Sequence, residues 1–389
     1  MTPAGLDPDR FLAEYWQKKP LLLRGAFRFE TPPISPEELA GLACEVEDEA
    51  RLIQERHPDG PWRVDYGPFS DEDFAALPDS HWTLLVTDCE KHRPALRRLI
   101  EPFRFIPDWR IDDLMISYAA DQGSVGPHVD AYDVFLIQLD GVREWRIGGP
   151  AMDAPCLPDL DLRILANFTA TDSWRLSPGD LLYLPPGIAH HGIARSPCLT
   201  ASVGFRAPSH REILQAWLDS VTLSIPETLR LGDPGLPPQA SPSEISADAA
   251  RTIRQILERH LQQDDQAFHH WLGAFLTETN ACDYLDDVQP SPLNRDAFLN
   301  RLRQPGTTLT RHPRARIAWQ QTGRTVIFSR NGESTELPAE LLDDIRLIGD
   351  NHHLQPKRFR HPDHPELQQL LYVLYSDQIL IIDDRPQNA

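Results

Sequence analysis

GPHVDAYDVFLIQLDG, residues 126–141, is the stretch of sequence that decides the fold. It begins with a tight Gly-Pro step, carries a His-x-Asp pair, and continues into the apolar run 134–137. A short apolar run between turn residues predicts a buried strand, and Asp140-Gly141 predicts a hairpin turn after it. Short strands of this kind alternate with Pro/Gly turns from 114 to 205, which predicts a double-sheet jelly roll or barrel.

His128 and Asp130 form the His-x-Asp pair and are candidate metal ligands. Residues two apart in a strand share a face, so both side chains can point into one cavity. A second predicted strand, 181–184, leads through a Pro-Pro-Gly turn to His190. Two imidazoles and one carboxylate are the ligand set of a non-heme Fe(II) facial triad, which leaves the opposite coordination face open for a cosubstrate and oxygen. The sequence therefore predicts an iron centre.

Neighbouring side chains offer alternatives to these ligands. His191 adjoins His190, and strand alternation lets only one of the two face the cavity, so the residues alone leave this choice open. Asp121 and Asp133 are further carboxylates near the first histidine. Asp133 is odd-spaced from Asp130, so we expect it on the opposite side of the chain. A His-x-Asp pair by itself is a weak signal, but here Gly/Pro turns precede both histidines.

Arg143, just after the predicted hairpin turn, is the candidate anchor for an anionic cosubstrate. Alternation along 142–147 places it on the apolar face of its strand. An arginine on an apolar face indicates an anion, and its planar fork suits a carboxylate such as that of 2-oxoglutarate. Ser117 could donate to the same carboxylate. The alternative is an ordinary salt bridge between Arg143 and Glu144.

Composition limits the class of protein. The chain has 389 residues, enough for two or three domains, and a formal net charge of −20, which argues against binding of nucleic-acid backbones. No N-terminal signal segment and no membrane span are expected. Neither a disulfide framework nor a zinc site is indicated, and a cytoplasmic location fits. The cysteines are five in number: Cys44, Cys89, Cys156, Cys198 and Cys282.

The second half of the chain changes character after 208. Apolar residues recur at helical spacing over 213–221 and 253–261, which predicts amphipathic helices and a homodimer interface. Strands and helices between 316 and 382 then resemble a small winged-helix unit. Its basic cluster, 357–361, is too short for a DNA-recognition helix, so we expect a structural or protein-contact role.

Five strings in the sequence carry a family resemblance. With them the chain resembles, over nearly its whole length, the bacterial JmjC-type ribosomal oxygenases that hydroxylate an arginine of a ribosomal protein. The strings are YWQKKPL (15–21), PDWRIDDLMIS (107–117), GPHVDAYDVF (126–135), YLPPG (183–187) and SVGFRAP (202–208).

The resemblance implies Fe(II) at His128, Asp130 and His190, with 2-oxoglutarate held by Arg143 and Ser117. It also implies an α+β fold, in which a double-stranded β-helix of the cupin/JmjC type precedes a helical dimerisation region and a C-terminal winged helix. The expected boundaries are 1–208 for the catalytic domain with its N-terminal helices, 209–290 for the helical region and 291–389 for the winged helix.

The implied reaction uses molecular oxygen and 2-oxoglutarate to hydroxylate the β-carbon of an arginine in the sixteenth protein of the large ribosomal subunit. A guanidinium needs acidic and aromatic neighbours. Asp112 or Asp113 can supply the charge, and the family likeness favours Asp113, with Met115 and Tyr132 along the side chain. Two alternatives remain. One is a related oxygenase acting on histidine, on another residue or on a methylated substrate, and the other is a cupin module that only binds.

Overall fold

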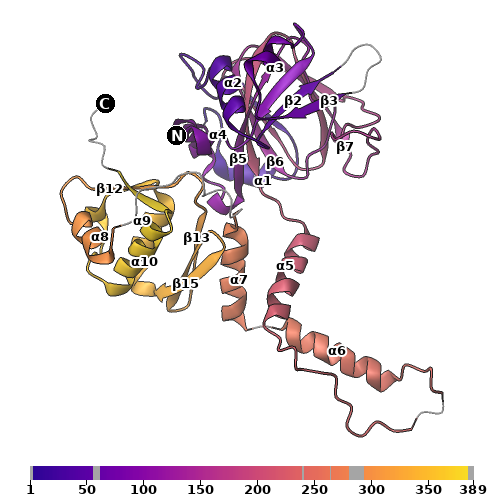
Figure 1. The fold of residues 1–389 in the computed structure, drawn as a ribbon. Coiled ribbons are helices and arrows are strands. Elements are labelled where there is room, and N and C mark those ends of the chain that lie inside the picture. The colour runs from indigo at the N-terminus through magenta and orange to yellow at the C-terminus, as the bar shows by residue number, and fades with distance from the viewer. Residues whose placement is uncertain (1–2, 56–61, 239–240, 263, 280–292, 384–389) are drawn as a thin grey trace. The chain divides into compact units, whose positions relative to one another are not determined.

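The computed structural model describes residues 3–55, 62–238, 241–262, 264–279 and 293–383, and it divides into two units, Met1–Ala207 and Pro208–Ala389. The first unit is the predicted jelly roll, and the second carries helices and small sheets (Figure 1). The α+β class is confirmed. Cys282 and the expected boundary at 290/291 lie outside the described residues, and the four described cysteines are free.

The first unit contains eleven named strands and four α-helices within the described ranges, with three 3-10 turns at Pro94–Leu99, Glu101–Phe103 and Asp108–Arg110. Its helices are α1 (Pro8–Glu14), α2 (Pro36–Glu45), α3 (Asp71–Ala75) and α4 (Cys89–His92). Its strands are β1 (Leu21–Leu23), β2 (Ala50–Gln54), β3 (Arg63–Tyr66), β4 (Trp82–Val86), β5 (Ile111–Ala119), β6 (Asp133–Asp140), β7 (Arg143–Pro150), β8 (Asp172–Leu176), β9 (Leu181–Leu184), β10 (Ile188–Ala194) and β11 (Cys198–Phe205).

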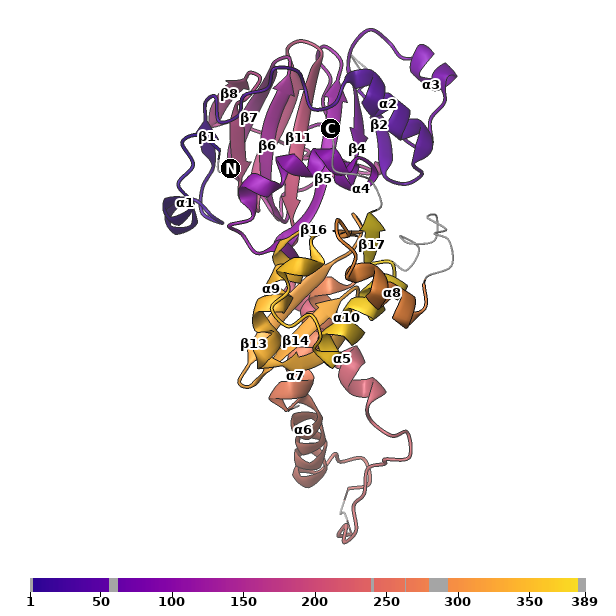
Figure 2. The same ribbon diagram turned by 90° about the vertical axis from the view of Figure 1, so that its left-hand side faces the viewer.

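Two antiparallel sheets form the jelly roll. The larger has the order β1-β9-β6-β11-β5-β4-β2-β3, and the smaller has the order β10-β7-β8 (Figure 2). An apolar cluster joins the facing surfaces, with Val134 and Leu136 of the large sheet against Trp145 and Ile147 of the small one. The face of the large sheet that bears these residues is called the inner face below.

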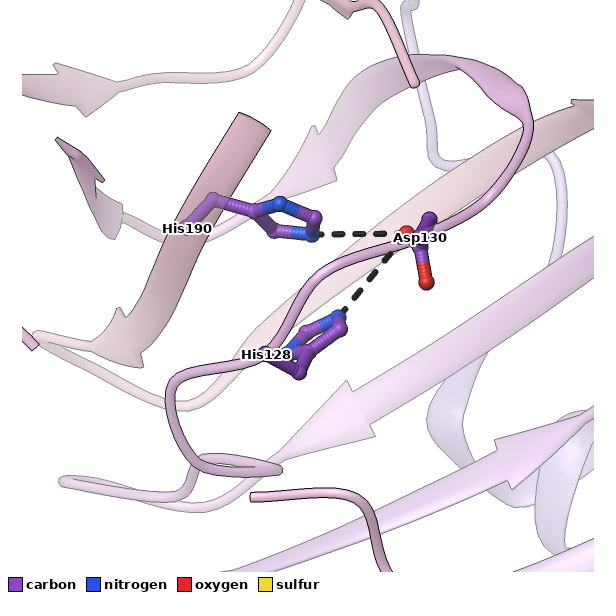
Figure 3. Close-up of side chains that lie close together, drawn as sticks. All are labelled: His128, Asp130 and His190. Carbon is purple, nitrogen blue, oxygen red and sulfur yellow. Dashed lines mark ion pairs between the residues drawn. The ribbon is translucent and has the colours of Figure 1, made fainter. Parts of the chain in front are cut away.

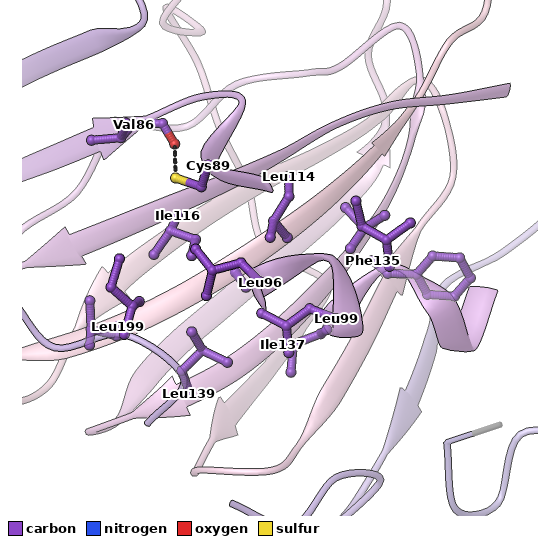
Figure 4. Packing of buried hydrophobic residues seen from close by; sticks show 14 of the residues in the cluster. Val86, Cys89, Leu96, Leu99, Leu114, Ile116, Phe135, Ile137, Leu139 and Leu199 are labelled. Carbon is purple, nitrogen blue, oxygen red and sulfur yellow. Dashed lines mark hydrogen bonds between the residues drawn. The ribbon is translucent and has the colours of Figure 1, made fainter. Parts of the chain in front are cut away.

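The outer face of the large sheet carries the main hydrophobic core. Leu114 and Ile116 of β5 alternate with the residues that point inward, and they pack with Phe135 of β6 against Leu96 and Leu99 of the first 3-10 turn (Figure 4). Because both faces of β6 and β11 are covered, the residues of these strands are buried almost throughout.

The turn at Asp140-Gly141 does not close a hairpin, so that prediction was wrong. The turn itself exists, because Gly141 has a φ of +62°, but β6 before it pairs with β9 and β11, whereas β7 after it pairs with β8 and β10. The chain therefore passes from the large sheet to the small sheet within two residues. A Cβ at Gly141 would lie 2.1 Å from the carbonyl oxygen of Pro197, so glycine is needed there.

The second unit begins with α5 (His210–Leu223), α6 (Ala247–Leu261) and α7 (Asp265–Thr277). Trp217 of α5 packs edge-on against Trp271 of α7, with ring centroids 4.8 Å apart. Helix α7 also contacts all three strands of a sheet formed by β13 (Ile317–Thr322), β14 (Thr325–Arg330) and β15 (Glu333–Pro338). An Asn331-Gly332 turn joins β14 to β15 as a hairpin.

The remaining elements complete a second core around Phe298 and Leu371. They are α8 (Arg295–Leu302), β12 (Thr308–Arg311), α9 (Leu342–Asp350), β16 (His353–Leu354), α10 (Pro365–Ser376) and β17 (Leu380–Asp383), with 3-10 turns at Ala339–Leu341 and Pro356–Arg358. Among the described residues, no helix combines the length and apolar character needed to cross a membrane.

Candidate metal centre

His128, Asp130 and His190 come together at one point of the jelly roll. Their ligand atoms all lie within 4.8 Å of one another, and no other described residues form such a group. The Asp130 Oδ2 atom is 3.4 Å from Nε2 of His190 and 3.9 Å from Nε2 of His128 (Figure 3). Three donors of this kind converging on one point can hold a divalent transition metal.

The two imidazoles are oriented by backbone carbonyl groups. Nδ1 of His128 lies 2.9 Å from the carbonyl oxygen of Gly126, and Nδ1 of His190 lies 2.9 Å from that of Ile188. Because a carbonyl oxygen only accepts, each Nδ1 carries the proton and donates. Each Nε2 therefore keeps its lone pair and faces the cluster, which is the tautomer that a metal requires.

The two histidines are also joined through their main chains. His128 N donates to His190 O at 3.0 Å, and His190 N donates to His128 O at 2.9 Å, in an isolated antiparallel bridge. The prediction that His128 belongs to a strand was therefore wrong, because it lies in the loop between β5 and β6. The spacing argument survives, since the extended backbone at the bridge still places His128 and Asp130 on one side.

Electrostatics favour a neutral imidazole next to an ionised carboxylate. Burial, together with the neighbouring His190, lowers the pKa of His128 to about 4. Burial alone would raise the pKa of Asp130, but the neighbouring imidazoles of His190 and His128 outweigh it, and the pKa is lowered. At neutral pH the cluster thus offers a neutral nitrogen donor at His128 beside the anionic oxygen donor of Asp130.

His191, the alternative ligand, points away from the cluster. Its Nε2 lies 2.9 Å from the hydroxyl of Ser124, which in turn accepts the N–H of Gly126 at 3.0 Å. Burial, followed by the charge of Arg146, lowers the pKa of His191 to about 4. His191 therefore supports the loop that carries His128. Of the two adjacent histidines, His190 is the one that faces the cluster.

Arg143 faces the interior of the jelly roll from the first position of β7. Its Nη1 donates to the hydroxyl of Ser117 at 3.0 Å, and its guanidinium carbon lies 5.1 Å from the ring centroid of Trp145. The side chain is buried, and this burial lowers its pKa. The Nε atom of Arg143 and the Nε1 atom of Trp145 are both buried without a hydrogen-bond partner in the described structure.

The salt bridge considered between Arg143 and Glu144 does not form. Glu144 lies on the opposite face of β7 and pairs with Arg146 at 2.9 Å, Arg195 at 3.2 Å and Arg175 at 3.4 Å. Hydrogen bonding, first of all from Arg195, lowers the pKa of Glu144 to about 2. Among the described residues, Arg143 is thus left facing the interior without a carboxylate partner.

Gly192 is a functional residue that sequence reasoning missed. A Cβ at this position would lie 2.8 Å from the Trp145 ring and 2.9 Å from Nε of Arg143. Glycine in the middle of β10 therefore makes room for both side chains. The available signal was a glycine inside a strand pattern, which often marks the close approach of another group.

Asp113, Met115 and Ser117 share the inner face of β5. Asp113 lies beside Gly204 of β11, where a Cβ would come within 2.9 Å of its Oδ1. Burial raises the pKa of Asp113 to about 8, with Glu90 as the next cause, and Glu90 itself accepts the N–H of Leu114 at 3.0 Å. The carboxylate is thus held in a partly protonated state.

The remaining candidate residues are Tyr132, Asp112 and Asp133. Tyr132 is 42% exposed, and its hydroxyl interacts with the Asp130 carboxylate. Asp112, the alternative to Asp113, is exposed and lies near Arg206 at 3.9 Å. Asp133 faces away, as expected, because its carboxylate accepts hydrogen bonds from Tyr183 at 2.6 Å and Gln17 at 3.0 Å.

Comparison with protein families gives two matches. Residues 98–213 match the JmjC domain, and residues 260–381 match the ROXA-like winged helix. The first match contains the metal-ligand cluster and Arg143. The second begins just before α7, in keeping with the packing of α7 on the β13–β15 sheet.

Two similar sequences and one solved structure match this chain over most of its length. The chain is 38% identical to the ribosomal protein uL16 3-hydroxylase of Escherichia coli, over 88% of this chain and 90% of that protein. It is 37% identical to a probable ribosomal oxygenase of Haemophilus influenzae, over 89% and 84% of the two chains. A solved structure of YcfD, a ribosomal oxygenase from Escherichia coli in complex with cobalt and 2-oxoglutarate, is similar with a TM-score of 0.83 at 34% identity, covering 98% of this chain and 99% of that one.

Proposed function

The chain belongs to the bacterial JmjC ribosomal oxygenases, and on this premise we propose that it uses Fe(II), 2-oxoglutarate and oxygen to hydroxylate an arginine of ribosomal protein uL16 at the β-carbon. The 3-hydroxylase similar over most of the chain supports the substrate protein and the position, since carbon 3 of an amino acid is its β-carbon. The choice of arginine rests on the family resemblance and on the acidic residue in the pocket.

The convergence of His128, Asp130 and His190 is the observation that carries the proposal. The Nε2 atoms of the two histidines and the single carboxylate fit Fe(II), and three protein ligands leave coordination positions for other groups. Cobalt in the similar ribosomal oxygenase shows that a divalent transition metal and 2-oxoglutarate are bound by a protein of this fold. Iron is the ion that the family and the oxygen chemistry imply.

The surroundings of Arg143 fit the far carboxylate of 2-oxoglutarate. A buried guanidinium with an unpartnered Nε lacks the anion that would normally accompany it. Ser117 accepts a hydrogen bond from its Nη1, so the hydroxyl and the guanidinium lie side by side. Gly192 keeps the space beside Nε free of any side chain.

When bound, the iron and 2-oxoglutarate would activate oxygen, with succinate and carbon dioxide as by-products. The protein would position the reacting carbon and exclude water. In this proposal Asp113 accepts the substrate guanidinium, Met115 contacts its methylene groups, and the exposed ring of Tyr132 lies along the side chain. The carboxylate of Asp113 must give up its proton for this, because only the ionised form accepts from a guanidinium at both oxygens.

Mass spectrometry of peptides tests the proposal directly. Overlapping peptides of uL16 are incubated with the protein, Fe(II), 2-oxoglutarate and oxygen, and succinate is measured alongside. We expect one added oxygen atom, located by fragmentation on an arginine, with His128→Ala and Asp130→Ala inactive. Oxidation on a histidine, or loss of a methyl group, would establish a related oxygenase instead. A protein that never converts 2-oxoglutarate would be a binding module.

Assembly and location belong to the same proposal. Helix α6 has no buried residue among those described, and its apolar side chains are exposed, with Leu257 at 58% and Ile253 at 48%. We infer that this face, with α5, forms a homodimer interface. We also propose a cytoplasmic location, which a ribosomal-protein substrate supports.

A further inference from the structure

Arg51 lies on the inner face of the large sheet, in the row of residues that contains Ser117. The strand register pairs Ser117 with Leu85, Leu85 with Arg51 and Arg51 with Tyr66, across β5, β4, β2 and β3. Directly opposed residues on neighbouring antiparallel strands point to the same face. Ser117 faces the small sheet, because it binds Arg143 of β7. Arg51 and Tyr66 therefore lie on the face that bears the candidate active site.

The guanidinium of Arg51 has no carboxylate partner in the described part of the chain. This stands out in a chain with a net charge of −20, in which acidic residues exceed basic ones by 58 to 38. Arg63 on the adjacent strand, for example, pairs with Asp65 at 2.8 Å. The side chain of Arg51 is only partly exposed, so its charge is held in place at the sheet surface.

Arg51 is also close to the proposed substrate pocket. Ser117, in the same row, is the next inner-face residue of β5 after Met115 of that pocket, and the charge of Arg51 also reaches the hydroxyl of Tyr132. Tyr132 is 42% exposed and Tyr66 is 50% exposed, so two aromatic rings accompany the cation on this face. The surface beside the pocket thus combines an acidic group, an uncompensated cation and exposed aromatic rings.

We propose that Arg51 determines substrate specificity by binding a carboxylate side chain that lies close in sequence to the target arginine. This rests on the proposed function, in which Asp113 takes the target guanidinium. A polypeptide whose arginine enters the pocket must lay its neighbouring residues on the adjoining surface. A free guanidinium there attracts a carboxylate through paired hydrogen bonds and repels a second cation, while Tyr66 and Tyr132 offer flat contact area to the chain.

A peptide series with charge exchanges tests this. Fluorescently labelled peptides carry one arginine, with Glu, Gln or Lys at each of the flanking positions in turn. Binding is measured by fluorescence anisotropy and turnover by mass spectrometry. For the wild-type protein we expect one position at which Glu binds roughly tenfold more tightly than Gln, and at which Lys binds more weakly still. Arg51→Gln removes this preference, Arg51→Glu reverses it, and Arg51→Lys retains part of it.

Arg63→Gln is the matched control, because it removes one positive charge from β3 on the opposite face, where Arg63 is already paired with Asp65. It should keep the wild-type preference. Thermal melting confirms that each variant is folded. The proposal fails if Glu, Gln and Lys peptides keep the same relative affinities in Arg51→Gln as in the wild type.

The measurements separate this inference from the function on which it rests. If no peptide is turned over, the proposed function fails, yet the anisotropy series still decides whether Arg51 selects a carboxylate. A nucleic-acid phosphate is the competing partner. If an RNA oligonucleotide binds in an Arg51-dependent way while peptide charge has no effect, the cation serves RNA and the specificity proposal is overturned.

Discussion

The guanidinium of Arg143 on the small sheet donates a 3.0 Å hydrogen bond to the hydroxyl of Ser117 on the large sheet. Ser117 in turn donates to the carbonyl oxygen of Thr200 at 3.4 Å, so the guanidinium is tied to two neighbouring strands of the opposite sheet. A cosubstrate carboxylate bound here would therefore be held by both halves of the jelly roll.

We expect Ser117→Ala to raise the KM for 2-oxoglutarate by about threefold to tenfold with little change in kcat, because the hydroxyl that accepts from Arg143 and orients its guanidinium is lost. Arg143→Gln should raise it by more than ~100-fold, because the charge and the fork are both lost. Succinate formation against 2-oxoglutarate concentration measures both. Ser173→Ala on β8, an exposed serine, is the control. An unchanged KM in Arg143→Gln would refute the assigned role.

Gly192→Ala should weaken 2-oxoglutarate binding and cost about 1–3 kcal/mol of unfolding free energy, since the added Cβ would meet the Trp145 ring at 2.8 Å and Arg143 at 2.9 Å. Gly149→Ala in the same sheet is a matched control, because nothing lies within 4 Å of a Cβ there. Denaturant unfolding and cosubstrate titration are the measurements. Equal behaviour of the two variants would contradict the space-making role of Gly192.

The two adjacent histidines should differ in metal binding. His190→Ala removes a ligand and is expected to lower the affinity for Co(II) by more than ~100-fold, whereas His191→Gln removes only the contact to Ser124 and should cost at most about tenfold. Calorimetric titration and the visible spectrum of bound Co(II) report on this without turnover. The reverse order of affinities would make His191 the ligand.

Substrate binding should depend on pH through Asp113, whose pKa burial raises to about 8 with the help of nearby acidic groups. Below this pH the carboxyl is largely protonated, and binding a guanidinium requires release of that proton. The KM for an arginine peptide should therefore fall as pH rises from about 6.5 to about 9, with affinity gained as the carboxyl ionises. The charged groups around Asp113 are Glu90, Asp88, Lys91 and Asp112.

Asp113→Asn tests that assignment, because it removes the titration while keeping the shape of the side chain. Its KM should be higher than that of the wild type and nearly flat over this pH range. If the wild-type and Asp113→Asn profiles keep the same slope, another group is responsible.

A homodimer should persist at micromolar concentration, so light scattering should report about twice the chain mass of 44.2 kDa. Leu257→Glu places a charge on the exposed apolar face of α6 and should give monomers. Gln255→Glu, on the other side of the helix, should leave the assembly intact. A wild-type protein that scatters as a single chain would rule out the interface.

The metal-ligand cluster could be predicted from the sequence because its signals are local. The two-residue spacing of His128 and Asp130 places both side chains on the same side of the chain. Alternation along β7 places Arg143 on the apolar face of its strand. Nothing local distinguishes His190 from His191, because the choice depends on where Ser124 lies in the folded chain.

Features that depend on sheet pairing were not visible in the sequence. Turn residues at Asp140-Gly141 specify a reversal but not the sheet that the next strand joins. The placement of Gly192 and Arg51 depends on their cross-strand neighbours, and β2 and β3, with five and four residues, give too short a pattern to recognise. These long-range relationships arise from register, which a single sequence does not encode locally.

The two-residue passage from β6 to β7 has an evolutionary consequence. A single inserted or deleted residue between Asp140 and Arg143 would shift β7 by one position, turn the guanidinium outward to the surface and bring Glu144 inward in its place. Variants that keep this chemistry must therefore preserve the length of the corner as well as Gly141, where a Cβ has no room.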